Sequence, residues 1–128
     1  MKILLSCLTA FLFLTAQAQT DSASKVAKFT TTTHSFGKIK QHVPATTEFT
    51  FTNVGTKPLI IEDAVAECGC TTPEYPKPPI PNGKTATIKV TYNAEALGKF
   101  TKRVTVKFAN IAQPVILTID GEVEPAKS

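Results

Sequence analysis

The chain has 128 residues and a formal net charge of +4, from 14 lysines and arginines against 10 aspartates and glutamates. This positive excess is small and scattered, so it does not indicate nucleic-acid binding. The length suits a single domain with one hydrophobic core. Composition therefore predicts one domain and no nucleic-acid partner.

The N-terminus has the three parts of a secretory signal peptide. A lysine follows the first methionine, residues 3–16 are almost wholly apolar, and Ala-Gln-Ala at 16–18 has the small-x-small cleavage pattern. The apolar run is shorter than the roughly 20 residues that span a bilayer, and no stop-transfer pattern follows, which disfavours a transmembrane anchor. We therefore expect a signal peptide over residues 1–18, no transmembrane segment after its cleavage, and a periplasmic or extracellular mature chain.

Cys7 lies inside this signal. The sequence Leu-Leu-Ser-Cys that ends there resembles the lipid-attachment box of lipoproteins. Such a box closes an apolar region, whereas most of the apolar region here, residues 8–14, follows the cysteine. We expect Cys7 to be removed with the signal, which leaves Cys68 and Cys70 as the only cysteines of the mature chain.

Two segments of the mature chain lack hydrophobic periodicity. Residues 19–28 are polar and small, and residues 124–128 resemble them. This composition predicts a flexible leader over 19–28 and a disordered tail over 124–128. The folded domain is therefore expected over residues 29–123.

Between these ends, apolar residues alternate with polar ones, which is the period of half-buried strands. The clearest alternating segments lie at residues 48–52, 87–92, 104–108 and 115–123. Turn signals separate them, as at Asn82-Gly83. No window of similar length has helical spacing, although residues 94–97 suit a single helical turn. The pattern predicts an all-β fold, with a β-sandwich favoured over a small barrel.

The chain has no tryptophan, so phenylalanines are expected to fill the core. The five expected core residues are Phe36, Phe49, Phe51, Phe100 and Phe108. We expect Tyr75 and Tyr92 to remain partly exposed.

The order of several short motifs resembles a bacterial family. The motifs are His34-Ser35-Phe36-Gly37-Lys38-Ile39, Phe49-Thr50-Phe51-Thr52-Asn53-Val54-Gly55, Pro58-Leu59-Ile60-Ile61, Cys68-Gly69-Cys70-Thr71-Thr72-Pro73, Ile80-Pro81-Asn82-Gly83-Lys84, Gly98-Lys99-Phe100 and Gly121-Glu122-Val123. Together they resemble the exported family called domain of unknown function 1573, over residues 29–123. The chain departs from that pattern at residues 41–43, Gln-His-Val, where the family usually has a glycine, and this alters one turn.

The resemblance implies a single immunoglobulin-like β-sandwich of about seven to eight antiparallel strands, related to ASPM-SPD-2-Hydin and major-sperm-protein-like domains. Those relatives mostly serve as interaction modules. The resemblance therefore implies an exported, non-catalytic protein. We expect it to need no cofactor and to bind an unidentified protein or envelope component.

Cys68-Gly69-Cys70 is the segment with the most reactive chemistry. Two thiols one residue apart in an oxidising compartment form a tight disulfide, a redox pair or metal ligands. A disulfide is sterically feasible, because Cα atoms two residues apart lie about 5.5 to 7 Å from each other and glycine accepts the backbone angles of a small ring. We interpret the pair first as a structural staple in a turn. Thiol-disulfide exchange and metal binding remain as alternatives.

A closed zinc site would need two ligands besides the cysteines. His34 and His42 are the only imidazoles in the chain, and nothing in their spacing links them to Cys68 and Cys70. No metal site is therefore predicted, and the alternative is that the two cysteines hold Cu(I) or part of a zinc site.

Residues 73–81 contain five of the nine prolines and favour a stiff, polyproline-like loop that crosses between sheets or covers an edge. Tyr75 in this loop and Thr71 beside the cysteines are candidate partner contacts. The chain has no phosphate loop, nucleophile elbow or zinc helix, so we expect no enzymatic activity. We expect a binding or structural module that uses a strand edge or this loop end. The alternative is a small periplasmic thiol-redox or copper-binding protein.

Overall fold

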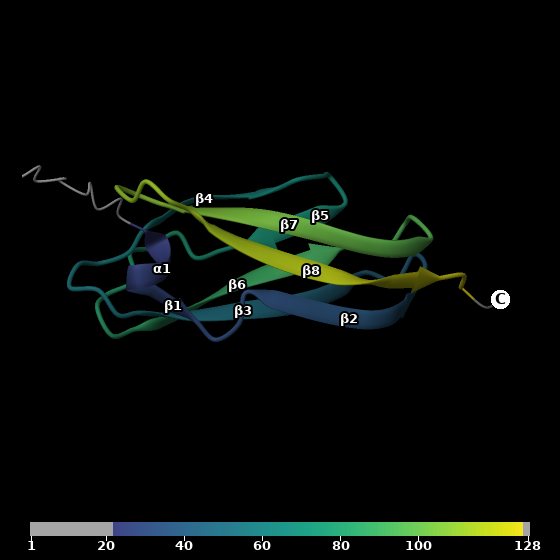
Figure 1. Ribbon diagram of the computed structural model, residues 1–128, viewed down its shortest axis with the longest axis horizontal. Coiled ribbons are helices and arrows are strands. Elements are labelled where there is room, and N and C mark those ends of the chain that lie inside the picture. The colour runs from purple at the N-terminus through teal and green to yellow at the C-terminus, as the bar shows by residue number, and fades with distance from the viewer. Residues whose placement is uncertain (1–21, 127–128) are drawn as a thin grey trace, which may run out of the picture.

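The computed structural model describes residues 22–126, so the predicted signal peptide, the start of the predicted leader and the last two residues lie outside it. Figure 1 shows two layers of strands packed face to face, with one short helix beside the first strand. The elements are α1 (Ala23–Val26), β1 (Ala27–Phe29), β2 (Thr33–Lys40), β3 (Ala45–Asn53), β4 (Ile61–Ala66), β5 (Thr71–Glu74), β6 (Thr85–Tyr92), β7 (Gly98–Phe108) and β8 (Val115–Glu124). Residues 22–126 include no helix long and apolar enough to cross a membrane.

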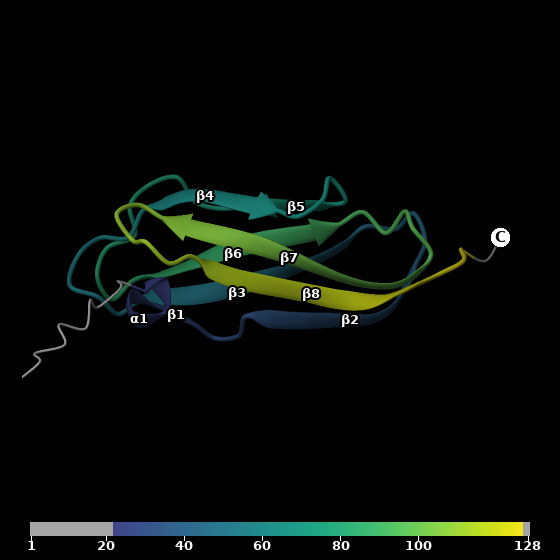
Figure 2. The same ribbon diagram turned by 45° about the horizontal axis from the view of Figure 1, so that its top comes forward.

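The strands form two four-stranded sheets, ordered β1-β3-β6-β5 and β2-β8-β7-β4. Neighbouring strands are antiparallel except β2 and β8, which run parallel. The predicted all-β sandwich of seven to eight strands is confirmed, but the expectation of antiparallel strands is wrong at this one pair. The chain moves from one sheet to the other between β1 and β2 without reversing direction, as Figure 2 shows, so β2 lies parallel to the last strand.

The core lies between the two sheets, where the inward residues of each strand meet. Four of the five expected phenylalanines are buried, and Phe36 is half-buried. Tyr92 is only 2 % exposed and stacks on Phe100, with ring centroids 3.9 Å apart. The expectation that Tyr92 is partly exposed is therefore wrong. Its position continues the inward alternation of Ile88 and Val90, and this alternation places the ring in the core.

The predicted flexible leader is wrong for the residues that the structure describes. Residues 23–26 form a one-turn helix, and Ala23 and Ala27 are 0 % and 2 % exposed. The Ala23 N–H donates to the carbonyl of Gln113, and the Val26 carbonyl accepts from Val54 N–H. Alanine side chains are small enough to pack flush against the core, and the polar residues around them hid this packing from the sequence pattern. Glu124, expected in the tail, is the last residue of β8.

Asn53 is a polar residue in the core, at the end of β3, and its side chain is 0 % exposed. Its side-chain amide N–H groups donate to the carbonyls of Lys57 and Ile80, at 2.8 and 2.9 Å, and its carbonyl accepts from the Gly55 N–H at 3.0 Å. This amide thus fixes the loop between β3 and β4 against the loop between β5 and β6.

Candidate functional site

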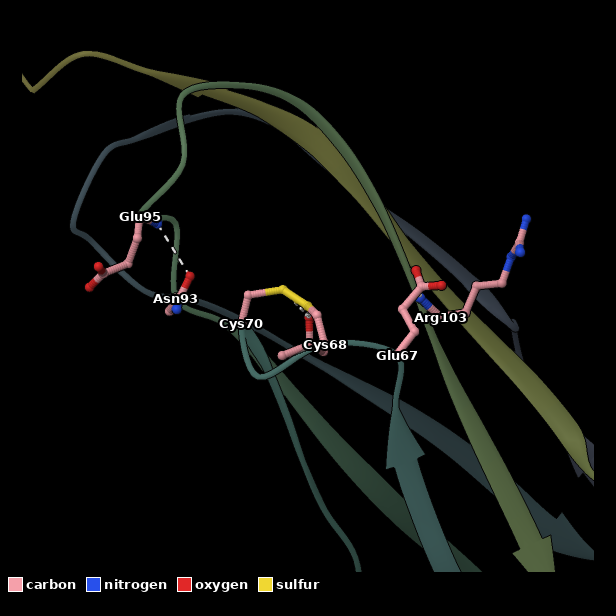
Figure 3. Close-up of a disulfide and its surroundings, with 7 residues drawn as sticks. Glu67, Cys68, Cys70, Asn93, Glu95 and Arg103 are labelled. Atoms are coloured by element: carbon pink, nitrogen blue, oxygen red, sulfur yellow. Dashed lines mark hydrogen bonds between the residues drawn. A yellow bond between two sulfur atoms is a disulfide. The ribbon is translucent and has the colours of Figure 1, made fainter.

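The two cysteines lie where the chain passes from one sheet to the other. β4 belongs to one sheet and β5 to the other, and only residues 67–70 connect them. Cys68 and Cys70 form a disulfide in this connection, with their Cα atoms 5.3 Å apart; Figure 3 shows it. The staple interpretation of the sequence agrees with this geometry. We call residues 67–70 the crossover.

Gly69, between the cysteines, is exposed, and a Cβ atom built on it would meet no atom within 4 Å. In the described part of the chain, the glycines with positive φ are Gly37, Gly83 and Gly98. Neither space nor a left-handed backbone therefore requires a glycine at position 69. The ring of the disulfide closes without a positive φ at this residue.

Hydrogen bonds hold the crossover at both ends, independently of the disulfide. At the β4 end, the Glu67 N–H donates to the Arg103 carbonyl at 3.1 Å, and the Arg103 N–H donates to Glu67 Oε1 at 3.0 Å. At the β5 end, the Asn93 N–H donates to the Cys70 carbonyl at 2.9 Å. The disulfide therefore joins two residues that the sheets already place near each other.

Thr71 lies beneath the disulfide. Its side chain is buried, at 4 % exposure, and its Oγ1 lies 3.8 Å from Cys68 Sγ and 3.7 Å from Cys70 Sγ. The prediction that Thr71 contacts a partner is therefore wrong, because the residue begins β5 on the inward side. Both cysteines themselves are half-buried, so the sulfur atoms lie between solvent and this hydroxyl.

The outer edge of β5 is poorly suited to pairing with another strand. The Cys70 carbonyl accepts from the N–H of Asn93, the residue after β6. By alternation, the backbone N–H and carbonyl groups of Thr72 and Glu74 point toward β6, and those of Thr71 and Pro73 point toward the outer edge. Pro73 has no N–H, and the Thr71 N–H already donates to the Cys68 carbonyl at 3.4 Å. Of the two docking modes expected from sequence, a strand edge is therefore disfavoured at β5.

A shallow depression of about 550 Å³ lies on the outer face of the second sheet, beside the crossover. The strand register places Val65 of β4, Thr105 of β7 and Ile116 of β8 in one row across three strands. Val65 and Ile116 are 50 % and 44 % exposed, which leaves two apolar side chains open to solvent on either side of a threonine. We call the residues that line this depression the crossover surface: Val65, Ala66, Glu67, Arg103, Thr105 and Ile116.

Charged groups border this surface. Figure 3 shows the Arg103 side chain extending away from the disulfide and from the Glu67 carboxylate. In residues 22–126 the one ion pair is between Lys38 and Glu124, at 3.5 Å, so the guanidinium of Arg103 has no carboxylate partner there. The crossover surface thus combines an apolar row with a cation that is free to pair.

The proline-rich loop follows β5. One interpretation of the sequence was that this loop crosses between the sheets, and the structure shows that it does not. β5 and β6 are antiparallel neighbours in one sheet, and residues 75–84 connect them. Tyr75 is half-buried and packs against the core, with Lys77 Nζ 4.3 Å from its ring centroid. The structure therefore places Tyr75 on this connection, with β5 between it and the cysteines.

Metal ligands do not gather at the cysteines. His34 lies in β2 and His42 in the turn that follows it. Over residues 22–126 no three or more His, Cys, Asp or Glu side chains come together in a way that could hold a metal ion. The zinc alternative therefore gains no further ligand from the described fold.

The fold and the site define an immunoglobulin-like β-sandwich with a disulfide at the crossover between its sheets. The sequence pattern of the family "Protein of unknown function (DUF1573)" matches residues 27–123, and the chain belongs to that family. This confirms the resemblance seen in the motifs. No protein with a curated description matches the chain.

Solved structures share the fold at low identity. A protein of unknown function from Porphyromonas gingivalis superposes with a TM-score of 0.66 and 14% identity, over 86% of this chain and 51% of its own. PapD-like domain 7 of human CEP192 gives a TM-score of 0.71 and 8% identity, over 87% and 94%. The YadV chaperone gives 0.51 and 17%, over 80% and 53%. This chain thus spans about half the length of the P. gingivalis chain, and these similarities establish the fold alone.

Sequence reasoning missed the crossover surface, although one signal was present. Residues 115–117 are Val-Ile-Leu, so Ile116 is apolar where the alternation requires a polar, outward residue. Val65 gave no such signal, because a register shift between Ile61 and Asp63 interrupts the alternation of β4.

Proposed function

We propose that this chain is a non-catalytic binding module of the bacterial cell envelope, which docks a protein partner on the crossover surface. The observation that carries the proposal is the row of Val65, Thr105 and Ile116, with two half-exposed apolar side chains on a sheet face otherwise rich in charged and hydroxyl groups. Exposed apolar groups with a polar rim are typical of protein interaction sites. Membership of a family related to interaction modules supports the same function.

The surface specifies the chemistry of its partner. Adjacent strands lie about 4.8 Å apart, so Val65 and Ile116 are separated by about 10 Å, which is enough for one apolar side chain to seat over Thr105. Arg103 borders the row and offers its unpaired guanidinium to a carboxylate. The partner expected here is a protein segment with an apolar side chain next to an acidic one.

The polar groups around the disulfide serve the fold, which supports a binding role over a catalytic one. The Glu67 carboxylate accepts from the Arg103 N–H, and the Asn93 side-chain carbonyl accepts from the Glu95 N–H at 3.2 Å, as Figure 3 shows. The Thr71 hydroxyl is buried against the sulfur atoms. Each of these groups already has a partner within the protein.

Binding to a native envelope extract tests the proposal, with Val65→Ala/Ile116→Ala as the variant and Val54→Ala as the matched control. Val54 is 51 % exposed, outside the crossover surface. Full burial of such a side chain stabilises by roughly 1.5–3 kcal/mol, so burying the exposed half of each residue on binding contributes about 1 kcal/mol. The double variant should therefore lose about 2 kcal/mol of binding free energy, which is about 30-fold in affinity. Unchanged affinity of the double variant for the captured partner, or equal loss in the control, contradicts the proposal.

The envelope location is tested separately. Cell fractionation and intact mass spectrometry of the exported chain should give a mature protein that begins at Gln19. A product that retains residues 1–18, or one confined to the cytoplasm, contradicts the location and leaves the binding assay unaffected.

A second candidate function is thiol-disulfide exchange, and the position of the Thr71 hydroxyl favours it. The two sulfur atoms are half-buried, and this hydroxyl lies within 3.8 Å of both, where it can donate to a thiolate formed at either cysteine. A partner dithiol would be oxidised to a disulfide while Cys68 and Cys70 become thiols. The two thiols, once they lose their protons, would also be suited to Cu(I).

Mass spectrometry with and without thiol alkylation, together with metal analysis, separates the two candidates. A disulfide that resists mild reductant, in protein without copper, contradicts the second candidate. Stoichiometric copper that is lost in Cys68→Ser and Cys70→Ser contradicts the purely structural role of the cysteines.

A further inference from the structure

β7 extends beyond the strand that covers its outer edge. It spans residues 98–108, whereas β4 pairs only with residues 104–108, and one further backbone bond runs from the Glu67 N–H to the Arg103 carbonyl. At Glu67 the chain turns away from Arg103 toward the disulfide, as Figure 3 shows. On its opposite side, this part of β7 pairs with β8. Within the described chain, one side of residues 98–102 therefore has no neighbouring strand, and we call this side the open edge.

The backbone of the open edge presents hydrogen-bonding groups to solvent. Arg103 directs its N–H and its carbonyl toward β4, because both bond to Glu67. Alternation directs the same groups of Thr101 and Lys99 to this side. Both residues are exposed, and no backbone partner for these four groups is found in residues 22–126. The open edge thus offers two N–H groups and two carbonyls in line with the end of β4.

The other edges of the two sheets carry features that hinder strand pairing. Pro73 interrupts the edge of β5. On β2, the register shifts beside Gly37, whose φ is 67°. On β4, the Ala64 N–H donates to Asp63 Oδ1 at 2.9 Å, and β1 has only three residues. Residues 98–102 contain no proline, and their pairing with β8 has no register shift, so the open edge lacks these features.

A lysine faces inward on the open edge. The alternation of β7 places Lys102 on the inward face with Phe100 and Val104, and Lys102 is half-buried. Within residues 22–126 its ammonium makes no ion pair, since the one pair there joins Lys38 and Glu124. An inward charge at an edge excludes a strand that would place an apolar side chain beside it. The same charge favours a strand that carries a carboxylate at that position.

The outward charges also select the occupant of the open edge. Lys99 and Arg103 are exposed on the outward face, and Glu67 beside them already bonds to the Arg103 N–H. Asp120 and Glu122 lie on β8, about 10 Å from the line that an added strand would take. A second copy paired antiparallel about residue 101 would place Lys99 opposite Arg103 twice, and like charges directly opposite destabilise a strand pair. The open edge is therefore matched to an acidic strand and not to itself.

We propose that the partner of this chain adds a strand to the open edge of β7, through an extended segment that places an acidic side chain beside Lys102. The added strand bonds to the free N–H and carbonyl groups of Lys99 and Thr101, which is recognition by β-strand addition. Its outward side chains lie next to Arg103, where the open edge meets the crossover surface. The inference rests on the proposed binding function and names the form in which the partner docks.

Hydrogen exchange with a selected peptide tests this inference. A displayed library of random short peptides is panned against the exported chain, and the tightest peptide is the probe. In the free chain, the N–H groups of Lys99 and Thr101 should exchange quickly, and those of Phe100 and Lys102, which point toward β8, should exchange slowly. Bound peptide should slow exchange at Lys99 and Thr101 by about tenfold or more. The peptide should carry an aspartate or a glutamate.

Two variants with matched controls separate backbone pairing from side-chain contact. Thr101→Pro removes one N–H of the open edge, a change that edge strands tolerate, and Thr101→Val keeps that N–H. Lys102→Glu reverses the inward charge, and Lys28→Glu makes the same change at an exposed residue of β1. Thr101→Pro and Lys102→Glu should each weaken peptide binding by about tenfold or more, whereas the two controls should not alter it. Urea unfolding checks that each variant is folded.

The possible outcomes separate this inference from the proposed function. The inference is overturned if no peptide is enriched, if bound peptide leaves exchange at Lys99 and Thr101 unchanged, or if folded Thr101→Pro binds as tightly as Thr101→Val. A dimer that protects these two N–H groups without peptide also overturns it, because a second copy then fills the edge. Binding that is lost in Val65→Ala/Ile116→Ala and kept in Thr101→Pro supports the crossover surface and overturns the inference. The reverse response supports the inference and contradicts docking on the apolar row.

Discussion

Replacing Cys68 and Cys70 with serine should lower the stability of the sandwich only modestly. A disulfide that closes a loop of about three residues stabilises by roughly 1.6 kcal/mol in the chain-entropy model. The hydrogen bonds of Glu67 with Arg103, and the bond from the Asn93 N–H to the Cys70 carbonyl, remain in the variant. We therefore expect a loss of about 1–2 kcal/mol, which lowers the Tm of a domain of this size by about 5–10 °C.

Urea unfolding followed by circular dichroism measures this loss. Three samples are compared: the oxidised protein, the same protein reduced with dithiothreitol, and the double serine variant. The reduced protein and the variant should have similar midpoints below that of the oxidised protein, with little change in the dependence on urea. A loss above about 4 kcal/mol, or a variant that no longer unfolds cooperatively, would refute the reasoning that the sheets hold the crossover without the disulfide.

Three other predictions concern single positions. Gly69→Ala should change the free energy of unfolding by less than about 0.5 kcal/mol. Gly121→Ala should lower it by about 1–3 kcal/mol, because the new Cβ would lie 2.9 Å from both a backbone oxygen and an aromatic ring. Chemical denaturation of both variants checks this difference, and equal effects contradict it. Asn53→Ala should cost about 2–4 kcal/mol, since it leaves the buried Ile80 carbonyl and the part-buried backbone groups of Lys57 and Gly55 without their partner, and a near-neutral result in the same assay contradicts it. Burial raises the pKa of Tyr92 above its ordinary value of 10.0, so the contribution of this protonated hydroxyl to stability is present below pH 10 and is lost as the pH rises through the folded-state pKa. Tyr92→Phe should therefore remove part of the fall in unfolding free energy between pH 9 and 11, and an unchanged fall contradicts this prediction.

The strands and the core followed from local sequence because a period of two is a local property. Phe49 and Phe51 alternate with polar residues, and the structure buries both completely. The same rule placed Ile88, Val90 and Tyr92 on one face. The structure follows this alternation and contradicts the separate expectation that Tyr92 stays partly exposed. The disulfide pairing was equally accessible, because two cysteines separated by one residue have few geometric choices.

The features that sequence reasoning missed depend on contacts between distant segments. Ala23 is buried because Gln113, ninety residues later in the chain, supplies a backbone partner. Thr71 is buried because β5 begins on the inward side after the crossover, which the sequence does not reveal. The row of Val65 and Ile116 requires the register of three strands, and the irregular pairing in β4 conceals one of its members.

The small contribution expected of the disulfide to stability indicates where its effect lies. It restricts the conformations of residues 67–70, which border the crossover surface, more than it holds the sheets together. Ordering the backbone of one residue costs about 1–2 kcal/mol, so a connection fixed before a partner arrives avoids that loss on binding. The disulfide should therefore act on affinity more than on folding. Reduction should weaken docking on the crossover surface while the sandwich stays folded.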